Sequence, residues 1–337
     1  MALRTYTALR LGVVVVIIAL AIAVGRMIAK DPNHCVQASL SAYYYTPVRP
    51  VFVGALLIIG FGMISMWGKS FLEDAALNLA GLLLTVVAFV PTLDATGCTL
   101  ADGQPQTPAD EEVKIVKLIE ANAPEVQSNF FTFLVTVCGV LLGILVIGGW
   151  LYLRARRLNR TEGKLLPPLS VVVGYVVTWV MAAGVVGTYY YLYQKSWIVD
   201  AENPGHNKWD ASHNSFFNYH VHSYSANIGV GLVVFAALLA AVDKTLNRAA
   251  RHRKFWLWTY AVLAGVMIIT AIVIKWIYKG DSGTWYGDHA TFLLEAILVG
   301  LIGVFWVLQT IDRRNQGAPK YTTLVPAAQP AREGSEK

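Results

Sequence analysis

This 337-residue chain contains eight long blocks of apolar residues. Each is long enough to cross the roughly 30 Å hydrocarbon core of a bilayer as a helix. Backbone N–H and C=O groups cannot stay unpaired in lipid, so blocks of this length fold as α-helices. We therefore predict an all-α fold, a polytopic transmembrane helical bundle with eight spans, at about 11–29, 51–67, 76–93, 130–153, 169–194, 223–243, 256–279 and 289–311.

The composition excludes an ordinary soluble domain. Hydrophobic residues make up 55% of the chain and charged residues 14%, with a mean hydropathy of +0.50. Globular proteins carry roughly 25% charged residues. The net charge of +6 and the pI of about 9.1 would suit a nucleic-acid partner if the basic residues formed a patch. They lie instead in short loops beside the spans, so we predict no nucleic-acid partner.

The basic residues predict an orientation with both termini in the cytoplasm (N-in/C-in). This topology places 18 of the 27 Lys and Arg residues on the inner side and gives a net charge of +11 inside against −5 outside. Short basic loops such as 154–164 and 244–254 are the ones the positive-inside rule weighs. The block at 11–29 also resembles a signal peptide, but Arg26 can snorkel at its outer end, and we interpret it as an uncleaved anchor. The predicted location is the bacterial cytoplasmic membrane.

The predicted organisation is a transmembrane domain over 1–314, an extracytoplasmic insertion over 94–129 within it, and a disordered cytoplasmic tail over 315–337. The tail is rich in Ala, Pro, Gly and charged residues, a composition that does not build a core. The longer loops are external, and six of the seven histidines lie on the outer side in this topology. If the protein has a site, we expect it to open outward.

Two of the three cysteines, Cys35 and Cys98, lie in external loops, which would be an oxidising compartment. We predict that they form a disulfide joining the first two outer loops, with two free thiols as the alternative. Cys138 lies within a span and is interpreted as a small packing residue.

A polar pocket is predicted at the outer ends of the last three spans. A carboxylate roughly 10 Å below the start of its helix, as at Glu295, costs about 2–3 kcal/mol or more unless it has a partner or an aqueous cavity. Lys275 is the natural partner by depth, and the pair would be either a structural tie or part of a functional site. The candidate pocket residues are His220, His222, Asn227, Lys275, Asp288, His289 and Glu295.

The same histidines permit a zinc site, since histidine and carboxylate are zinc ligands. Its ligands would be His220, His222 and His289, with Asp288 nearby. Two histidines in a His-x-His pattern point about 200° apart on a helix, so the site would serve best if residues 218–222 are extended or only entering the helix. We predict no cofactor, and zinc is the alternative.

Three consecutive tyrosines precede the second span in the segment SLSAYYYTPVRPVFVG at 39–54. They are typical of an interfacial aromatic belt. The alternative is a rim that binds lipid headgroups, with a guanidinium able to clamp a phosphate. The candidate rim residues are Ser39, Ser41, Tyr43, Tyr44, Tyr45 and Arg49.

Four stretches together resemble a family of uncharacterised bacterial multi-pass membrane proteins that is loosely similar to the Frag/DRAM/Sfk-like group. They are the 39–54 segment, LEDAALNLAGLLLTVVAFVPT at 72–92, HVHSYSAN at 220–227 and FLLEAI at 292–297. The resemblance covers most of the spans, but neither the 101–128 insertion nor the tail. It implies fold and membrane location, and no activity.

A more distant similarity is to the alkaline ceramidase/PAQR-like membrane hydrolases, which use a Ser, an Asp and three His to hold zinc. Ser39 or Ser41 and the histidines of spans six and eight match in part. The chain lacks the His-x-x-x-His of that group's last helix and an Asp inside span three, where Asp94 stands at the very end.

Three functions therefore stay open, and whether the protein is an enzyme is undecided. The first is a non-enzymatic protein whose outward-facing pocket binds or organises lipid or a partner protein. The second is a metal-dependent lipid hydrolase. The third is an ion-coupled transporter that uses Lys275 and Glu295. The chain contains no G-x-S-x-G, H-E-x-x-H, P-loop or G-x-G-x-x-G motif.

Overall fold

The computed structural model describes residues 2–92 apart from 33, 67 and 69, much of 121–154, several positions between 176 and 190, and residues 211–246, 252–278 and 284–313. All regular structure among these residues is helical. The elements are α1 (Ala2–Lys30), η1 (Ser41–Tyr45, a 3-10 turn), α2 (Arg49–Ser65), α3 (Phe71–Phe89), α6 (Ala211–Leu246), α7 (Arg253–Val273), η3 (Ile274–Tyr278, a π-helical turn), α8 (Trp285–Asp288) and α9 (Ala290–Arg313).

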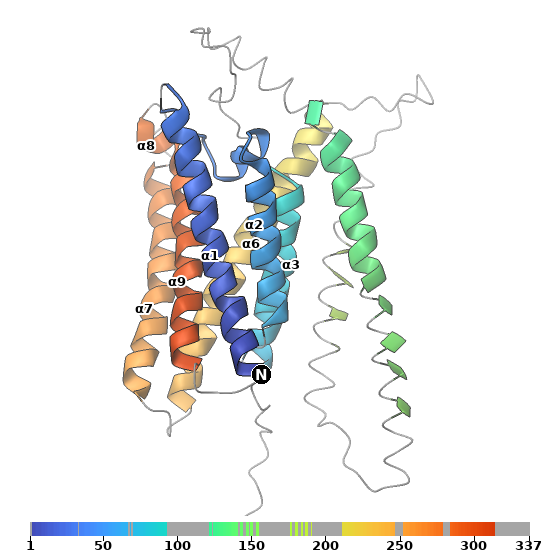
Figure 1. Ribbon diagram of the computed structural model, residues 1–337, viewed down its shortest axis with the longest axis vertical. Coiled ribbons are helices and arrows are strands. Elements are labelled where there is room, and N and C mark those ends of the chain that lie inside the picture. The colour runs from blue at the N-terminus through green and yellow to red at the C-terminus, as the bar shows by residue number, and fades with distance from the viewer. Residues whose placement is uncertain are drawn as a thin grey trace, which may run out of the picture.

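The six long helices named above form a closed ring in chain order. Helix α1 packs on α2, α2 on α3, α3 on α6, α6 on α7, and α7 on α9. Helix α9 packs on α1 and so closes the ring. Figure 1 shows these helices standing side by side, with α8 and the loop after α1 at one end and the N-terminus at the other. A further helical stretch at 124–140 lies outside the ring, where Phe130 and Leu134 pack against Val86 of α3.

Five helices of the described part of the chain are long and apolar enough to cross a membrane, and α2 is a shorter apolar helix. These six correspond to predicted spans one, two, three, six, seven and eight. The positions described within spans four and five are helical, but eight spans and the N-in/C-in orientation remain predictions. The insertion at 94–129 is described only near its end, where the helix at 124–140 begins before the predicted start of span four. The tail at 315–337 lies outside the described residues.

The outward faces of the helices are those of a lipid-embedded protein. On α1 the exposed stripe is Leu11, Val15, Ile18 and Ile22, which recurs at helical spacing. On α7 and η3, Trp258 is 65% exposed and Trp276 is 75% exposed. These tryptophans are eighteen residues apart, a rise of about 27 Å. That distance matches the separation of the two aromatic belts of a bilayer-spanning protein.

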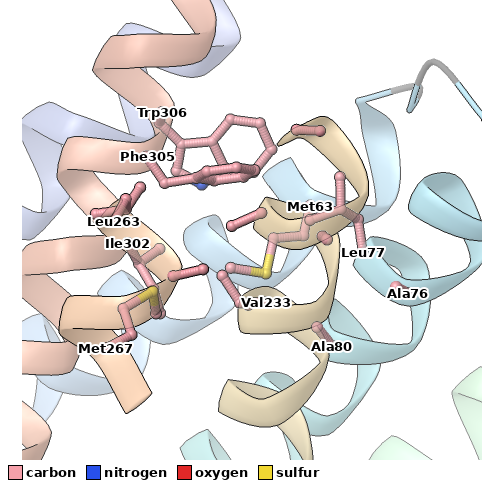
Figure 2. Packing of buried hydrophobic residues seen from close by; sticks show 14 of the residues in the cluster. Met63, Ala76, Leu77, Ala80, Val233, Leu263, Met267, Ile302, Phe305 and Trp306 are labelled. Atoms are coloured by element: carbon pink, nitrogen blue, oxygen red, sulfur yellow. The ribbon is translucent and has the colours of Figure 1, made fainter. Parts of the chain in front are cut away.

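The middle of the ring is filled by methionine, aromatic and small side chains. Figure 2 shows Phe305 and Trp306 of α9 facing Met63 of α2, with Val233 of α6 and Met267 of α7 beside them. Unbranched thioether side chains adapt to irregular gaps between aromatic rings. The core therefore seals the ring between its two ends, and the buried ionisable side chains gather at those ends.

Helices α2 and α3 approach each other closely at a pair of glycines. A Cβ built on Gly81 would lie 2.4 Å from the carbonyl oxygen of Gly60 and 2.9 Å from Cγ1 of Ile64. Both neighbours belong to the facing helix, and the nearer one is backbone that cannot rotate away. Glycine at position 81 is thus required for the approach of α2 to α3.

We expect Gly81→Ala to lower the free energy of unfolding by about 2–3 kcal/mol, because the added methyl group pushes the two helices apart. The matched control is Gly54→Ala on α2, where a Cβ meets nothing within 4 Å. The control should be neutral or slightly stabilising. Unfolding by SDS titration in mixed micelles measures both, and equal curves for the two variants would contradict the role given to Gly81.

Candidate functional site

The loop between α1 and α2 is docked onto the start of α9; this loop and its end of the ring are called outer after the predicted orientation. The backbone N–H of Phe292 donates to the carbonyl oxygen of Ala38 at 2.8 Å. His289 Nε2 lies 3.0 Å from the carbonyl oxygen of Val36. The 3-10 turn Ser41–Tyr45 that follows is buried against α1, α2 and the end of α3. The loop therefore closes the outer end of the ring.

The side chain of Glu295 binds this loop through two hydrogen bonds. Its Oε2 atom accepts the backbone N–H of Leu40 at 2.7 Å and that of Ser41 at 3.3 Å. Its Oε1 atom lies 3.9 Å from Nε2 of His222, and the Glu295 side chain is 22% exposed. Placing this carboxylate within a membrane span costs free energy. Two backbone N–H donors and a neighbouring imidazole offset that cost, as polar partners do for ionisable groups in spans.

His222 joins α6 to the same cluster. Its Nδ1 atom is 2.7 Å from the carbonyl oxygen of Val90, at the end of α3. Its Nε2 atom is 3.3 Å from Oγ of Ser41, which in turn is 3.3 Å from Oγ of Ser39. His222, Ser39 and Ser41 are all buried. We call Ser39, Ser41, His222 and Glu295 the outer cluster.

Three of the remaining predicted pocket residues, Asn227, Lys275 and Asp288, are exposed at the protein surface. The side chain of His220 lies outside the described residues. The contacts described for Glu295 are with the loop backbone and His222. The pairing of Glu295 with Lys275 stays a prediction.

The headgroup rim predicted at 39–49 stays a prediction, and most of its members are buried. Ser39, Ser41, Tyr43 and Tyr44 are buried inside the protein, because the 3-10 turn folds inward over the ring. Burial raises the pKa of the phenols of Tyr43, Tyr44 and Tyr45, so these tyrosines remain neutral hydrogen-bonding groups.

Arg49 also differs from the phosphate clamp that the rim would require, because protein groups already surround its guanidinium. It forms an ion pair with Glu125 at 2.8 Å and donates to Asn122 at 3.3 Å. It also donates to the hydroxyl of Tyr44 and lies 4.0 Å from the centre of that ring. Arg49 therefore ties the first outer loop to the stretch that leads into the helix at 124–140.

The described residues give no support to the predicted zinc site. They contain no group of three or more His, Cys, Asp or Glu side chains placed to hold a metal ion. His289 directs Nδ1 at the carbonyl oxygen of Trp285 at 2.8 Å and Nε2 at that of Val36 at 3.0 Å. Both ring nitrogens thus face carbonyl oxygens of the protein, and in a neutral ring only one of these contacts is a hydrogen bond, because a carbonyl oxygen only accepts. The ring of His289 also stacks on Trp285 with centroids 4.7 Å apart.

Cys35 is disulfide-bonded, and Cys138 has an exposed free thiol. Cys98, the partner predicted from the sequence, lies outside the described residues, so the pairing itself stays a prediction. A disulfide at Cys35 would hold the loop that carries Ser39 and Ser41 close to the second outer loop.

We expect maleimide labelling of Cys35 to require reductant. The experiment uses a Cys138→Ser background, which removes the thiol that is free in the native protein. Peptide mapping should show labelling at both Cys35 and Cys98 after reduction and at neither before it. Equal labelling of Cys98 in the two conditions would refute the pairing.

A second polar cluster lies at the opposite end of the ring, and the sequence analysis did not identify it. Oε1 of Glu73, at the start of α3, accepts from Arg313 Nη2 at 2.5 Å and from Gln309 Nε2 at 3.0 Å. Beside it, Lys244 of α6 pairs with Asp312 of α9 at 2.7 Å. The four charged side chains are each no more than 5% exposed. We call these five residues the inner cluster.

Tyr260 of α7 completes the inner cluster's contacts by donating to Oδ2 of Asp312 at 3.2 Å. The inner cluster thus fastens the end of α9 to α3, α6 and α7. Two sequence signals could have revealed it. Ser70-x-x-Glu73 is a capping-box pattern, and Ser70 does accept the N–H of Glu73 at 3.2 Å. Gln309, Asp312 and Arg313 recur at i, i+3 and i+4 where an apolar helix should simply end.

No family model, curated protein or solved structure matches this chain. The resemblance to uncharacterised bacterial membrane proteins therefore stays a prediction. The described structure does support an all-helical protein embedded in a membrane.

Proposed function

We propose that this protein is a membrane protein that binds an outer-leaflet phospholipid with an amine-bearing headgroup. The observation that carries the proposal is the position of Glu295. One carboxylate oxygen is engaged by the loop backbone, and the other lies 3.9 Å from Nε2 of His222. The partly exposed carboxylate lies just below the membrane interface, at the depth where headgroup amines meet the hydrocarbon.

The exposed side chains around the start of α9 support a lipid as the ligand. Trp276, Trp285 and Tyr286 are each more than half exposed, and η3, which carries Lys275, packs on α9. Aromatic rings at this level favour the interface and attract ammonium groups. Lys275 complements a lipid phosphate, and the carboxylates of Asp288 and Glu295 complement an amine.

The test is the thermal stability of the detergent-purified protein with added lipids of one acyl composition. Phosphatidylethanolamine should raise the melting temperature more than phosphatidylglycerol or phosphatidylcholine. A ligand at a hundred times its Kd stabilises the folded state by about 2.7 kcal/mol. Glu295→Gln should remove the preference for phosphatidylethanolamine, and Asn227→Asp, a matched change at an exposed outer-end residue, should keep it. Equal stabilisation by all three lipids would overturn the proposal.

An ion-coupled transporter is the second candidate, because α9 is fastened to buried ionisable groups at both ends of the ring. Helices held this way are suited to switching between two packings, since polar contacts at each end can exchange. Proton flux into proteoliposomes loaded with pyranine tests this function. Flux that requires the native carboxylate at Glu295 would favour the transporter. Flux unchanged in Glu295→Gln, or no flux above protein-free vesicles, would contradict it.

A further inference from the structure

His222 is held in one tautomer by its surroundings. Its Nδ1 atom lies 2.7 Å from the carbonyl oxygen of Val90, and a carbonyl oxygen can only accept. Nδ1 therefore carries the hydrogen, and in the neutral ring Nε2 carries a lone pair. That lone pair faces Oγ of Ser41 at 3.3 Å. The imidazole is consequently placed as a base for the hydroxyl of Ser41.

The hydroxyl groups form a directed chain toward this base. Ser39 Oγ accepts the backbone N–H of Ala42 at 3.0 Å, which leaves its own hydrogen for Ser41 Oγ at 3.3 Å. Ser41 then accepts from Ser39 and donates to His222. The hydrogen of Ser41 then points at a base, which is the arrangement of an activated serine.

Glu295 places a carboxylate near the imidazole of His222, where a negative charge stabilises the protonated ring. Its Oε1 atom lies 3.9 Å from Nε2 of His222, so a proton taken by the imidazole would sit beside a carboxylate. The Val90 carbonyl accepts from the other nitrogen in either protonation state. A nucleophile, a base and a group that orients the base are thus all present, which is the logic of the hydrolase triads without their sequence motifs.

We infer that Ser41 is a nucleophile, that His222 is its general base, and that the pair cleaves carboxylic esters that carry an apolar acyl chain. Ser41 Oγ attacks the ester carbonyl while its proton moves to Nε2 of His222. The C–O bond to the alcohol then breaks, and the alcohol leaves with that proton. Water, deprotonated by the same imidazole, attacks the acyl-serine, releases the fatty acid and restores the Ser41 hydroxyl.

The substrate class in this inference rests on the proposed lipid site, since a lipid bound at Glu295 would bring its glycerol esters to the level of the outer cluster. The reactivity of Ser41 does not rest on it. The two can therefore fail separately. A Ser41 that reacts in a protein with no lipid preference would support the activity alone, and lipid selectivity with an inert Ser41 would support binding alone.

The test is labelling of the purified full-length protein by an alkyl fluorophosphonate, which forms a stable adduct only with an activated serine. We expect one adduct per chain, mapped by peptide mass spectrometry to Ser41. Ser41→Ala should abolish labelling. His222→Gln should slow it about 100-fold or more, the usual contribution of a general base. Ser128→Ala, at an exposed outer-end serine, is the matched control and should label like the native chain.

Mapping on the native protein decides the inference even if a variant fails to fold. No adduct at millimolar probe, or an adduct on a serine other than Ser41, would overturn it. An adduct on Ser41 that forms at the same rate in His222→Gln would overturn the role given to the histidine. Hydrolysis of a long-chain nitrophenyl ester, lost in Ser41→Ala, would extend the result from reactivity to turnover.

Discussion

Arg313→Met should lower the free energy of unfolding by about 3–5 kcal/mol, the usual result of removing one partner from a buried ion pair. The substitution leaves Glu73, whose side chain is 1% exposed, without its guanidinium. Gln309 would remain as a neutral donor to Glu73, and it cannot balance a charge in a span. SDS titration in mixed micelles measures the loss, and the variant should also yield less protein in the membrane.

The double variant Glu73→Gln, Arg313→Met separates charge from packing. It removes both charges, and it should recover most of the stability lost in Arg313→Met, since neutral replacements of a buried pair are often close to neutral in effect. Lys254→Met changes an exposed cation at the same end of the ring, and its effect should stay within about 0.5 kcal/mol. A double variant as unstable as Arg313→Met would show that side-chain shape, rather than the unpaired charge, dominates.

Glu295→Ala should release the first outer loop at a cost of about 2–4 kcal/mol. The change leaves the N–H groups of Leu40 and Ser41 without the acceptor they share, and each buried donor left without a partner costs roughly 1–3 kcal/mol. The effect is local, because the loop's contacts from Phe292 to Ala38 and from His289 to Val36 do not involve the Glu295 side chain. We therefore expect loop opening before global unfolding.

Amide hydrogen exchange detects this release. Exchange at Leu40 and Ser41 should quicken roughly 30-fold or more for a loss of 2 kcal/mol. Glu295→Gln keeps an acceptor oxygen at the same place and should fall between the native chain and Glu295→Ala. Asn227→Ala, at an exposed position of α6, should leave the two amides unchanged. Unaltered protection of Leu40 and Ser41 in Glu295→Ala would show that the loop is held by other contacts.

The helices of the ring were predictable from long apolar blocks, because a membrane span can be identified by its length and composition alone. The ends of these helices were harder to predict. α3 begins at Phe71, five residues before predicted span three, because Ser70 caps the helix and Glu73 finds partners within the protein. Likewise, α9 runs on to Arg313. A span boundary drawn from hydropathy falls at the first charged residue. Hydropathy does not distinguish a charged side chain in water from one that is buried against an opposite charge on another helix.

Glu295 and His222 could be identified as unusual from depth and spacing, but their partners could not. Glu295 is paired with backbone N–H groups, which every residue possesses and no sequence pattern marks. The tyrosines of 43–45 look like an interfacial belt because composition does not say which way a loop folds. Nor does composition say which way a side chain points, as for Lys275, which lies in a π-helical turn and is exposed.

The inner cluster also bears on how the protein is made. α3 and α6 precede α9 in the chain, so Glu73 and Lys244 enter the bilayer before Arg313 and Asp312 are synthesised. A charged side chain at a span's centre costs about 2.5–3.5 kcal/mol for insertion, and less near its ends. A nascent chain stalled before α9 would therefore hold two charges deprived of the partners that α9 supplies. Arrival of this helix completes the ring and supplies a partner to each of the two charges, so unfinished copies differ chemically from finished ones.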